Sequence, residues 1–172
     1  HLDGLADSID AWTGGMGDRE KSLAIMKDPA IGPHGVVALL LVLMIKTAAI
    51  ALLLDQQRFM LLLAIPMLGR AVMLRLLLTA PYVRQEGMGA TMARHLPQLP
   101  GWTVLAITAG LILAVAQQAA PLMVGAAAVV AWGWLHLWRR RIGGLTGDVI
   151  GAACELAETA AIVAAALLVG SM

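Results

Sequence analysis

Charged side chains are scarce in this chain of 172 residues, where Asp, Glu, Lys and Arg together make up 13% of the sequence. That is about half of their usual share in a soluble domain, near 25%. The net charge is only +1, and the basic residues are scattered and lack neighbouring aromatic residues. A nucleic-acid-binding surface needs clustered basic side chains, so we expect no nucleic-acid partner.

Cysteine, strand-like patterns and linkers are lacking as well. The single cysteine, Cys154, lies in an apolar stretch and cannot form an internal disulfide, so nothing indicates an oxidising compartment. No alternation of apolar and polar residues is long enough for a strand, and no low-complexity segment separates two domains. We therefore expect an all-α protein with one domain over residues 1–172.

Apolar residues account for 60% of the chain and occur in long runs such as Gly35–Leu54. A helix of about 20 such residues matches the ~30 Å hydrocarbon layer of a bilayer. The sequence therefore predicts a polytopic membrane helix bundle in a lipid bilayer, and a homo-oligomer is compatible with it. The expected spans are 35–54, 59–79, 102–119, 122–138 and 149–170, after the end of a helix at Leu2–Trp12 and a short amphipathic helix at Asp18–Met26.

The distribution of Lys and Arg between the loops predicts the orientation. Eight of these residues lie in the segments 13–34, 80–101 and 139–148, whereas 55–58 and 117–121 carry only Arg58. Positive side chains are retained on the cytoplasmic side. We therefore expect a multi-pass protein of the inner membrane, with the eight basic residues facing the cytoplasm.

Three carboxylates open the sequence at helical spacing. Asp3, Asp7 and Asp10 point in directions of about 0°, 40° and −20° on a helix, so they share one face. Like charges that close repel each other, unless a cation lies between them. Hard carboxylate oxygens are the ligands that Mg²⁺ prefers, so these residues are candidate metal ligands, and an acidic surface turn is the alternative.

A second acidic group lies near the other end of the chain, where Gly144 and Gly147 precede Asp148. Asp148, Glu155 and Glu158 share one face of an otherwise apolar helix, and carboxylates within a span normally face protein, water or an ion. Glycines let the backbone approach a ligand, and a helix start favours phosphate. Both acidic groups are expected at the cytoplasmic ends of their helices, where one pocket can contain them.

Basic residues within the predicted spans have two interpretations. Lys46 and Arg70 can bind phosphate groups, or they can pair with Glu155 or Glu158 inside the membrane. Arg84 lies in the longest loop and is either a ligand-binding residue or an ordinary solvated charge.

Several strings of this sequence, in order, resemble the cobalamin synthase family, the adenosylcobinamide-GDP ribazoletransferases. The matching residues are His1-Leu2-Asp3-Gly4-Leu5-Ala6-Asp7 with Asp10; Met26-Lys27-Asp28; Gly32-Pro33-His34-Gly35; Lys46; Arg84-Gln85-Glu86-Gly87-Met88-Gly89; and Gly144-Leu145-Thr146-Gly147-Asp148 with Gly151-Ala152 and Glu155. The family has further membrane segments before the His-Leu-Asp motif, and the chain opens at His1, so we expect that an N-terminal part is absent here.

The resemblance implies a Mg²⁺-dependent enzyme. Its substrates would be adenosylcobinamide-GDP and α-ribazole or its 5′-phosphate, and its products GMP and adenosylcobalamin or its phosphate. The expected metal ligands are Asp3, Asp7, Asp10 and Asp148, and the expected catalytic residues are Asp7, Asp148 and Glu155, with Glu155 or another free acid as the base. Substrate phosphates would be bound by Lys46, Arg70, Arg84, Gly144 and Gly147.

Two other functions are compatible with parts of this pattern. A membrane phosphotransferase of the CDP-alcohol type also uses helix-borne aspartates and Mg²⁺, but its motif spacing does not occur here. A secondary transporter would use the charges within the spans as an ion path, yet the sequence shows no internal repeat.

Overall fold

The computed structural model describes residues 1–84 and 88–170, and every regular element within these two ranges is a helix. The expected all-α class is therefore confirmed. The helices are α1 (Leu2–Gly14), α2 (Arg19–Ile25), α3 (Pro33–Asp55), α4 (Phe59–Thr79), α5 (Met88–His95), α6 (Gln98–Ala116), the 3₁₀ helix η1 (Gln117–Ala119), α7 (Ala120–Ile142) and α8 (Gly147–Gly170).

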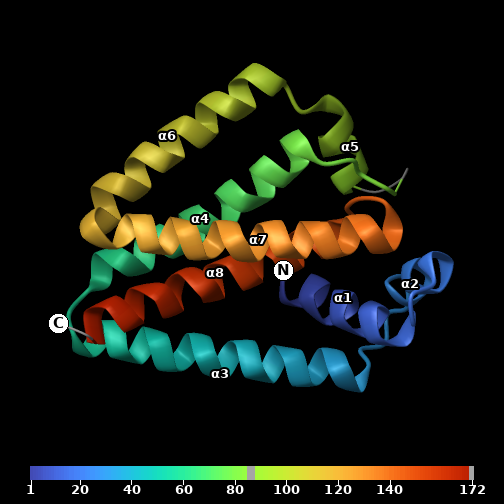
Figure 1. The fold of residues 1–172 in the computed structure, drawn as a ribbon, viewed down its shortest axis with the longest axis horizontal. Coiled ribbons are helices and arrows are strands. Elements are labelled where there is room, and N and C mark those ends of the chain that lie inside the picture. The colour runs from blue at the N-terminus through green and yellow to red at the C-terminus, as the bar shows by residue number, and fades with distance from the viewer. Residues whose placement is uncertain (85–87, 171–172) are drawn as a thin grey trace.

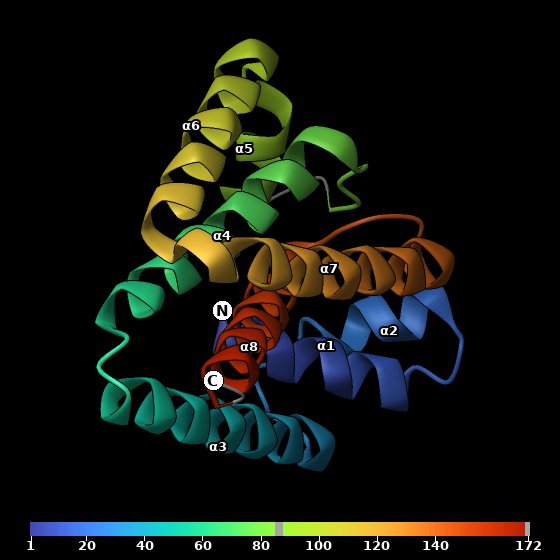
Figure 2. The same cartoon turned by 60° about the vertical axis from the view of Figure 1, so that its left-hand side comes forward.

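Four stretches of the described chain are long and apolar enough to cross a membrane, which makes this a multi-pass membrane protein. They are Pro33–Asp55, Phe59–Thr79, Gln98–Ile142 and Gly147–Gly170. The third stretch has 45 residues and contains both α6 and α7, with η1 between them. Figures 1 and 2 show that the chain reverses there, so the predicted spans 102–119 and 122–138 correspond to two separate helices.

Helix α8 forms the centre of the bundle and contacts α1, α3, α4 and α7 (Figure 1). Its alanines at positions 153, 157, 161 and 165 are fully buried and follow one another every four residues. Such small residues let helix backbones approach closely in lipid, where packing rather than water exclusion holds helices together. By contrast, Leu40, Leu41 and Met44 of α3 are more than half exposed, as expected for a surface that faces lipid.

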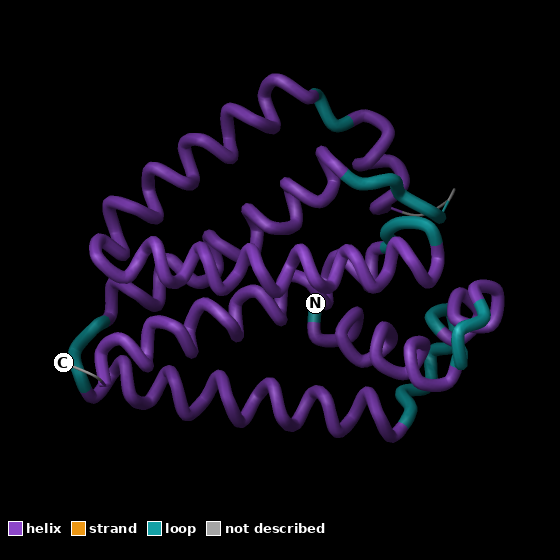
Figure 3. Tube along the Cα trace, in the orientation of Figure 1, coloured by secondary structure: helices purple, strands orange, loops and turns teal. Residues whose placement is uncertain are grey.

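The turns gather at two ends of the bundle (Figure 3). The α3–α4 turn, the α6–α7 turn and the end of α8 lie at one end, and the α1–α2 and α7–α8 turns lie at the other. This is the grouping on which the count of basic residues depends. Which end faces the cytoplasm stays a prediction.

Helix α5 was missed by the sequence analysis, which expected an irregular loop at 80–101. It has eight residues and ends on Arg94 and His95. Two turns carry too few residues to show a helical period, and the glycine at its second position disfavours a helix.

Candidate active site

Helix α1 packs directly on the beginning of α8 at a glycine. A Cβ atom added to Gly4 would lie 2.7 Å from the carbonyl oxygen and 2.9 Å from the Cα of Asp148. Only a residue without a side chain permits this approach. Because Asp3 and Asp7 flank Gly4 on α1, the contact brings both acidic ends of the sequence together.

The pKa of Asp7 reflects the closeness of the other carboxylates. Its pKa is raised to about 6, first by partial burial and then by the negative charges of Asp3, Asp148 and Asp10, and Arg84 offsets part of this rise. The charges that act on Asp7 are therefore three negative side chains and one positive side chain, Arg84. The cluster stabilises an added positive charge, whether a proton or a metal cation.

Arg84 is brought to the cluster by a short pairing of two loops. Val83 N–H donates to the Leu145 carbonyl and Leu145 N–H donates to the Pro81 carbonyl, each at 2.8 Å. Gly144 makes the pairing feasible, because a Cβ there would lie only 2.3 Å from the Pro81 oxygen. The glycine predicted as a phosphate contact therefore serves, in this structure, to join the loops before α5 and α8.

The guanidinium of Arg84 spans the gap between Asp148 and the end of α2. Its Nη2 atom lies 2.8 Å from Oδ2 of Asp148 and donates to the Met26 carbonyl at 3.2 Å. Its Nε is buried and has no hydrogen-bond partner within residues 1–84 and 88–170. Arg84 is thus an ion-paired residue of the cluster and not a solvated charge, and one buried N–H remains available for an anion.

Thr146 caps the first turn of α8, since its hydroxyl accepts a hydrogen bond from Val149 N–H at 3.3 Å. The predicted phosphate contact Gly147 begins the helix, and the Tyr82 hydroxyl lies 3.5 Å from where its Cβ would be, an ordinary contact distance. The start of α8 therefore lies beside Arg84, Asp3 and Asp7, and an anion site at its N–H groups stays a prediction.

Asp10 lies on the expected face of α1, but its carboxylate is hydrogen-bonded to the beginning of α3. Its carboxylate accepts hydrogen bonds from Gly32 N–H at 2.7 Å and Gly35 N–H at 2.9 Å, which caps the start of α3. Helical spacing gives the direction of a side chain, whereas the neighbouring helix decides what it meets. The structure thus gives Asp10 a helix-capping role in place of a free carboxylate.

Lys46 and Arg70 are ion-paired inside the bundle. The Nζ atom of Lys46 lies 2.5 Å from Glu155 and 3.0 Å from Glu158, and Arg70 also donates to Glu158. Glu158 follows Asp148 by ten residues, about 15 Å along a helix. Of the two interpretations of these basic residues, the structure shows the ion pairs, in a cluster with no net charge that is distinct from the aspartates.

The donor set at Asp3, Asp7 and Asp148 fits Mg²⁺ by its chemistry, although no three candidate ligands among the described residues already enclose one point. Mg²⁺ rarely requires such a cage, because it keeps several waters and binds one or two carboxylates together with substrate phosphates. Asp148 also has a buried Oδ2 without a well-oriented hydrogen bond in the described chain. The carboxylates therefore fit this ion by their chemistry, with its other positions left to water or to oxygen atoms of a ligand.

Sequence reasoning missed Gly4, whose absent side chain sets the distance between the two acidic groups. A signal was present, because a glycine inside a helix costs about 1 kcal/mol relative to alanine and usually has a packing reason. Met26 stands in one of the matching strings, but its contact with Arg84 is made by a backbone carbonyl, which residue types do not reveal.

Comparisons with known proteins agree over nearly the whole chain. The family model described as cobalamin-5-phosphate synthase matches residues 1–166. The relative named adenosylcobinamide-GDP ribazoletransferase from Pseudomonas fluorescens strain Pf0-1 is 51% identical over 97% of this chain and 69% of its own length. Relatives of the same name from Pseudomonas savastanoi pv. phaseolicola and Acinetobacter baumannii strain ACICU are 52% and 42% identical, over 98% and 94% of this chain and 69% and 65% of their own lengths. No solved structure matches.

Proposed function

Since the chain belongs to the cobalamin-5-phosphate synthase family, we propose that it joins adenosylcobinamide-GDP to α-ribazole or its 5′-phosphate. It is an enzyme, a transferase of cobalamin biosynthesis. In the proposed reaction the ribazole hydroxyl attacks the phosphorus attached to cobinamide, and the bond from that phosphorus to GMP breaks. The hydroxyl proton leaves to a base, and GMP departs with the electron pair of the broken bond.

The meeting of Asp3, Asp7 and Asp148 with Arg84 at one end of the bundle is the observation that carries this proposal. Phosphoryl transfer depends mainly on positioning the diphosphate and on neutralising the charge that develops on its oxygens. A group of acids with one arginine is arranged for a metal–diphosphate complex rather than for the diphosphate alone.

We propose Asp3, Asp7 and Asp148 as the residues that hold Mg²⁺, with Asp10 as the residue that fixes α1 against α3. When bound, Mg²⁺ would neutralise the diphosphate and stabilise the leaving phosphate of GMP. Release of Asp148 from its ion pair would free Arg84, whose guanidinium then binds the diphosphate through the forked geometry that suits phosphate oxygens. Arg84 therefore exchanges one anionic partner for another.

The base is better sought on α1 than at Glu155. Glu155 is bound to Lys46 and lies about 10 Å along α8 from Asp148. Burial and the neighbouring carboxylates raise the pKa of Asp7 to about 6, so an acid of this cluster that does not hold the metal can accept a proton near neutral pH. We assign Lys46 and Arg70 to the assembly of the bundle and leave phosphate binding to Arg84 and the start of α8.

We propose that the active site lies at the end of the bundle that carries most Lys and Arg residues. Because positive loops are retained in the cytoplasm, the substrates would be taken from the cytoplasmic side of the inner membrane. Labelling of single cysteines introduced at exposed positions of the two ends, with a reagent that does not cross the membrane, tests this orientation in intact cells.

The decisive experiment measures GMP release by the purified protein in lipid vesicles with Mg²⁺, adenosylcobinamide-GDP and α-ribazole. We expect turnover that stops when a chelator removes the metal and that falls at least a hundredfold in Asp148→Asn. Asp55→Asn is the matched control, because Asp55 is an exposed acid at the opposite end of the bundle. Turnover by Asp148→Asn at the control rate would refute the proposed site.

The two alternatives give other outcomes in the same vesicles. A CDP-alcohol phosphotransferase would release CMP from a CDP-linked substrate and no GMP from adenosylcobinamide-GDP. A transporter would change the ion content of the vesicles without forming any nucleotide.

A further inference from the structure

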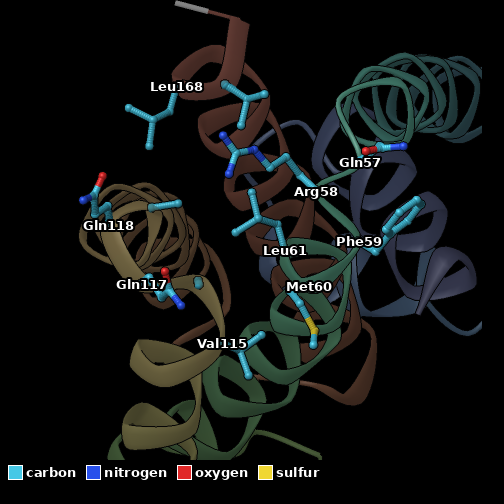
Figure 4. Close-up of a pocket in the computed structure, with 12 residues that line it drawn as sticks. Gln57, Arg58, Phe59, Met60, Leu61, Val115, Gln117, Gln118 and Leu168 are labelled. Atoms are coloured by element: carbon cyan, nitrogen blue, oxygen red, sulfur yellow. The ribbon is translucent and has the colours of Figure 1, made fainter. Parts of the chain in front are cut away.

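A cavity of about 450 Å³ lies at the end of the bundle opposite the carboxylates. It is bounded by the α3–α4 turn, the α6–α7 turn and the last residues of α8 (Figure 4). The proposed reaction does not use it, because Asp148 and Arg84 lie near the other end of the bundle. Its function is therefore a separate question.

The lining of this cavity combines polar residues of the turns with apolar residues of the adjoining helix ends. Gln57, Arg58 and Gln117 lie in the turns where the spans end, and Leu61 and Val115 follow them in the first turn of α4 and the last turn of α6. A phospholipid has the same order of groups, with a polar head at the membrane surface and apolar chains below it. The cavity therefore matches an amphipathic ligand better than a fully polar solute.

Arg58 supplies a positive charge without an acidic partner. No ion pair joins it to any other residue in the two described ranges, and the nearby Asp55 accepts a hydrogen bond from Gln56 instead. Figure 4 shows its guanidinium extending between the end of α8 and the α6–α7 turn. It is the single basic residue in the loops of this end, where the positive-inside rule disfavours one, so an anion is the natural partner.

The backbone at the rim of the cavity is held in an unfavourable conformation. Three non-glycine residues of the described chain have positive φ, and two of them, Gln57 at 55° and Gln117 at 48°, line this cavity. Side chains disfavour this region, and such residues persist where the surrounding structure fixes them, often at ligand sites. Both turns that bound the cavity therefore have a backbone conformation that the surrounding structure fixes.

We propose that this cavity binds the phosphate head group of an anionic phospholipid, with Arg58 as its counter-ion and the amides of Gln117 and Gln118 as further donors. The chemistry that Arg58 recognises is a phosphate oxygen, which both a lipid and free phosphate provide. The apolar wall formed by Leu61 and Val115 decides for the lipid, because inorganic phosphate gains nothing from it.

The test uses native mass spectrometry of the protein released from vesicles that contain equal amounts of phosphatidylglycerol and phosphatidylcholine. The wild type should retain phosphatidylglycerol selectively. Arg58→Gln should reduce this retention about tenfold or more, since removing a charged hydrogen-bond donor corresponds to at least about 1.4 kcal/mol. Arg75→Gln is the matched control, because Arg75 is an exposed arginine of α4 outside the cavity, and this variant should retain lipid like the wild type.

A second variant, Val115→Trp, fills the apolar part from α6 and keeps Arg58, so it should also lose the lipid. Turnover and helix content measured in parallel should stay unchanged in both variants, which excludes misfolding as the cause. Equal retention of phosphatidylglycerol by Arg58→Gln and the wild type would overturn the proposal. So would equal retention of both lipids by the wild type, or equally effective binding of inorganic phosphate to the lipid-free protein.

Discussion

Replacing Gly4 by alanine separates α1 from α8 without changing any charged group. The new Cβ would lie 2.7 Å from the Asp148 carbonyl oxygen, and ordinary contact begins at 3.4 Å, so the two backbones must move apart by 3.4 − 2.7 = 0.7 Å. The neighbouring atom is backbone and cannot rotate away. The distance from Asp3 and Asp7 to Asp148 therefore increases by a similar amount.

The expected loss of turnover follows from this displacement. A misplacement of about 1 Å at a reacting centre costs about a hundredfold in rate, so a shift of 0.7 Å should cost between about tenfold and a hundredfold. The stability should change much less, because alanine favours the helix by about 1 kcal/mol over glycine and overpacking costs about 1–3 kcal/mol. Gly4→Ala should thus fold and insert, and fail mainly in catalysis.

The matched control is Gly151→Ala, at the same interface and one turn further along α8. A Cβ there would lie 3.4 Å from the Cα of His1, an ordinary contact, so no displacement is needed. GMP release and the thermal unfolding of both variants should be measured in the same vesicles. If Gly4→Ala turns over like Gly151→Ala, the distance between α1 and α8 does not control the site, and the reasoning is refuted.

Three further predictions concern charges of the bundle. The pKa of Asp7 is raised from 3.8 in the unfolded chain to about 6 in the folded, metal-free protein, so its contribution to stability is full below pH 3.8 and is lost as the pH rises through about 6. Mg²⁺ competes with this proton, so the increase in melting temperature on adding Mg²⁺ should become larger between pH 3.8 and pH 6. This dependence on pH should be absent in Asp7→Asn. Lys46→Met should destabilise the protein by about 3–5 kcal/mol in thermal unfolding, because it leaves a buried acid unpaired, and adding Glu155→Gln should recover part of that loss; a further loss in the double variant would contradict the pairing. Asp10→Ala should lower the stability by about 1–2 kcal/mol through the lost cap of α3, while Mg²⁺ binding measured by calorimetry persists; loss of that binding in a folded variant would make Asp10 a ligand.

Much of this protein follows from local patterns in the chain. The length and polarity of each apolar run specify the membrane spans, and the spacing of Asp3 and Asp7 specifies that they share a helix face, because both properties belong to a single helix. The motif strings also indicated the family that the comparisons then showed. The short helix α5 was not predicted, because a helix of two turns has too few residues to show a helical period in the sequence.

The partners of the charged side chains depend on how the helices pack. Asp10 lies on the same helix face as Asp7, yet its carboxylate accepts a hydrogen bond from the N-terminus of α3. The sequence allowed either phosphate or Glu155 as the partner of Lys46, and the packing of α3 against α8 brings Lys46 to Glu155. Helical periodicity fixes a direction about one axis and says nothing about which neighbour lies in that direction. The sequence therefore determined the helices and their charged faces, whereas the tertiary structure decided which charges form a reaction centre and which hold the bundle together.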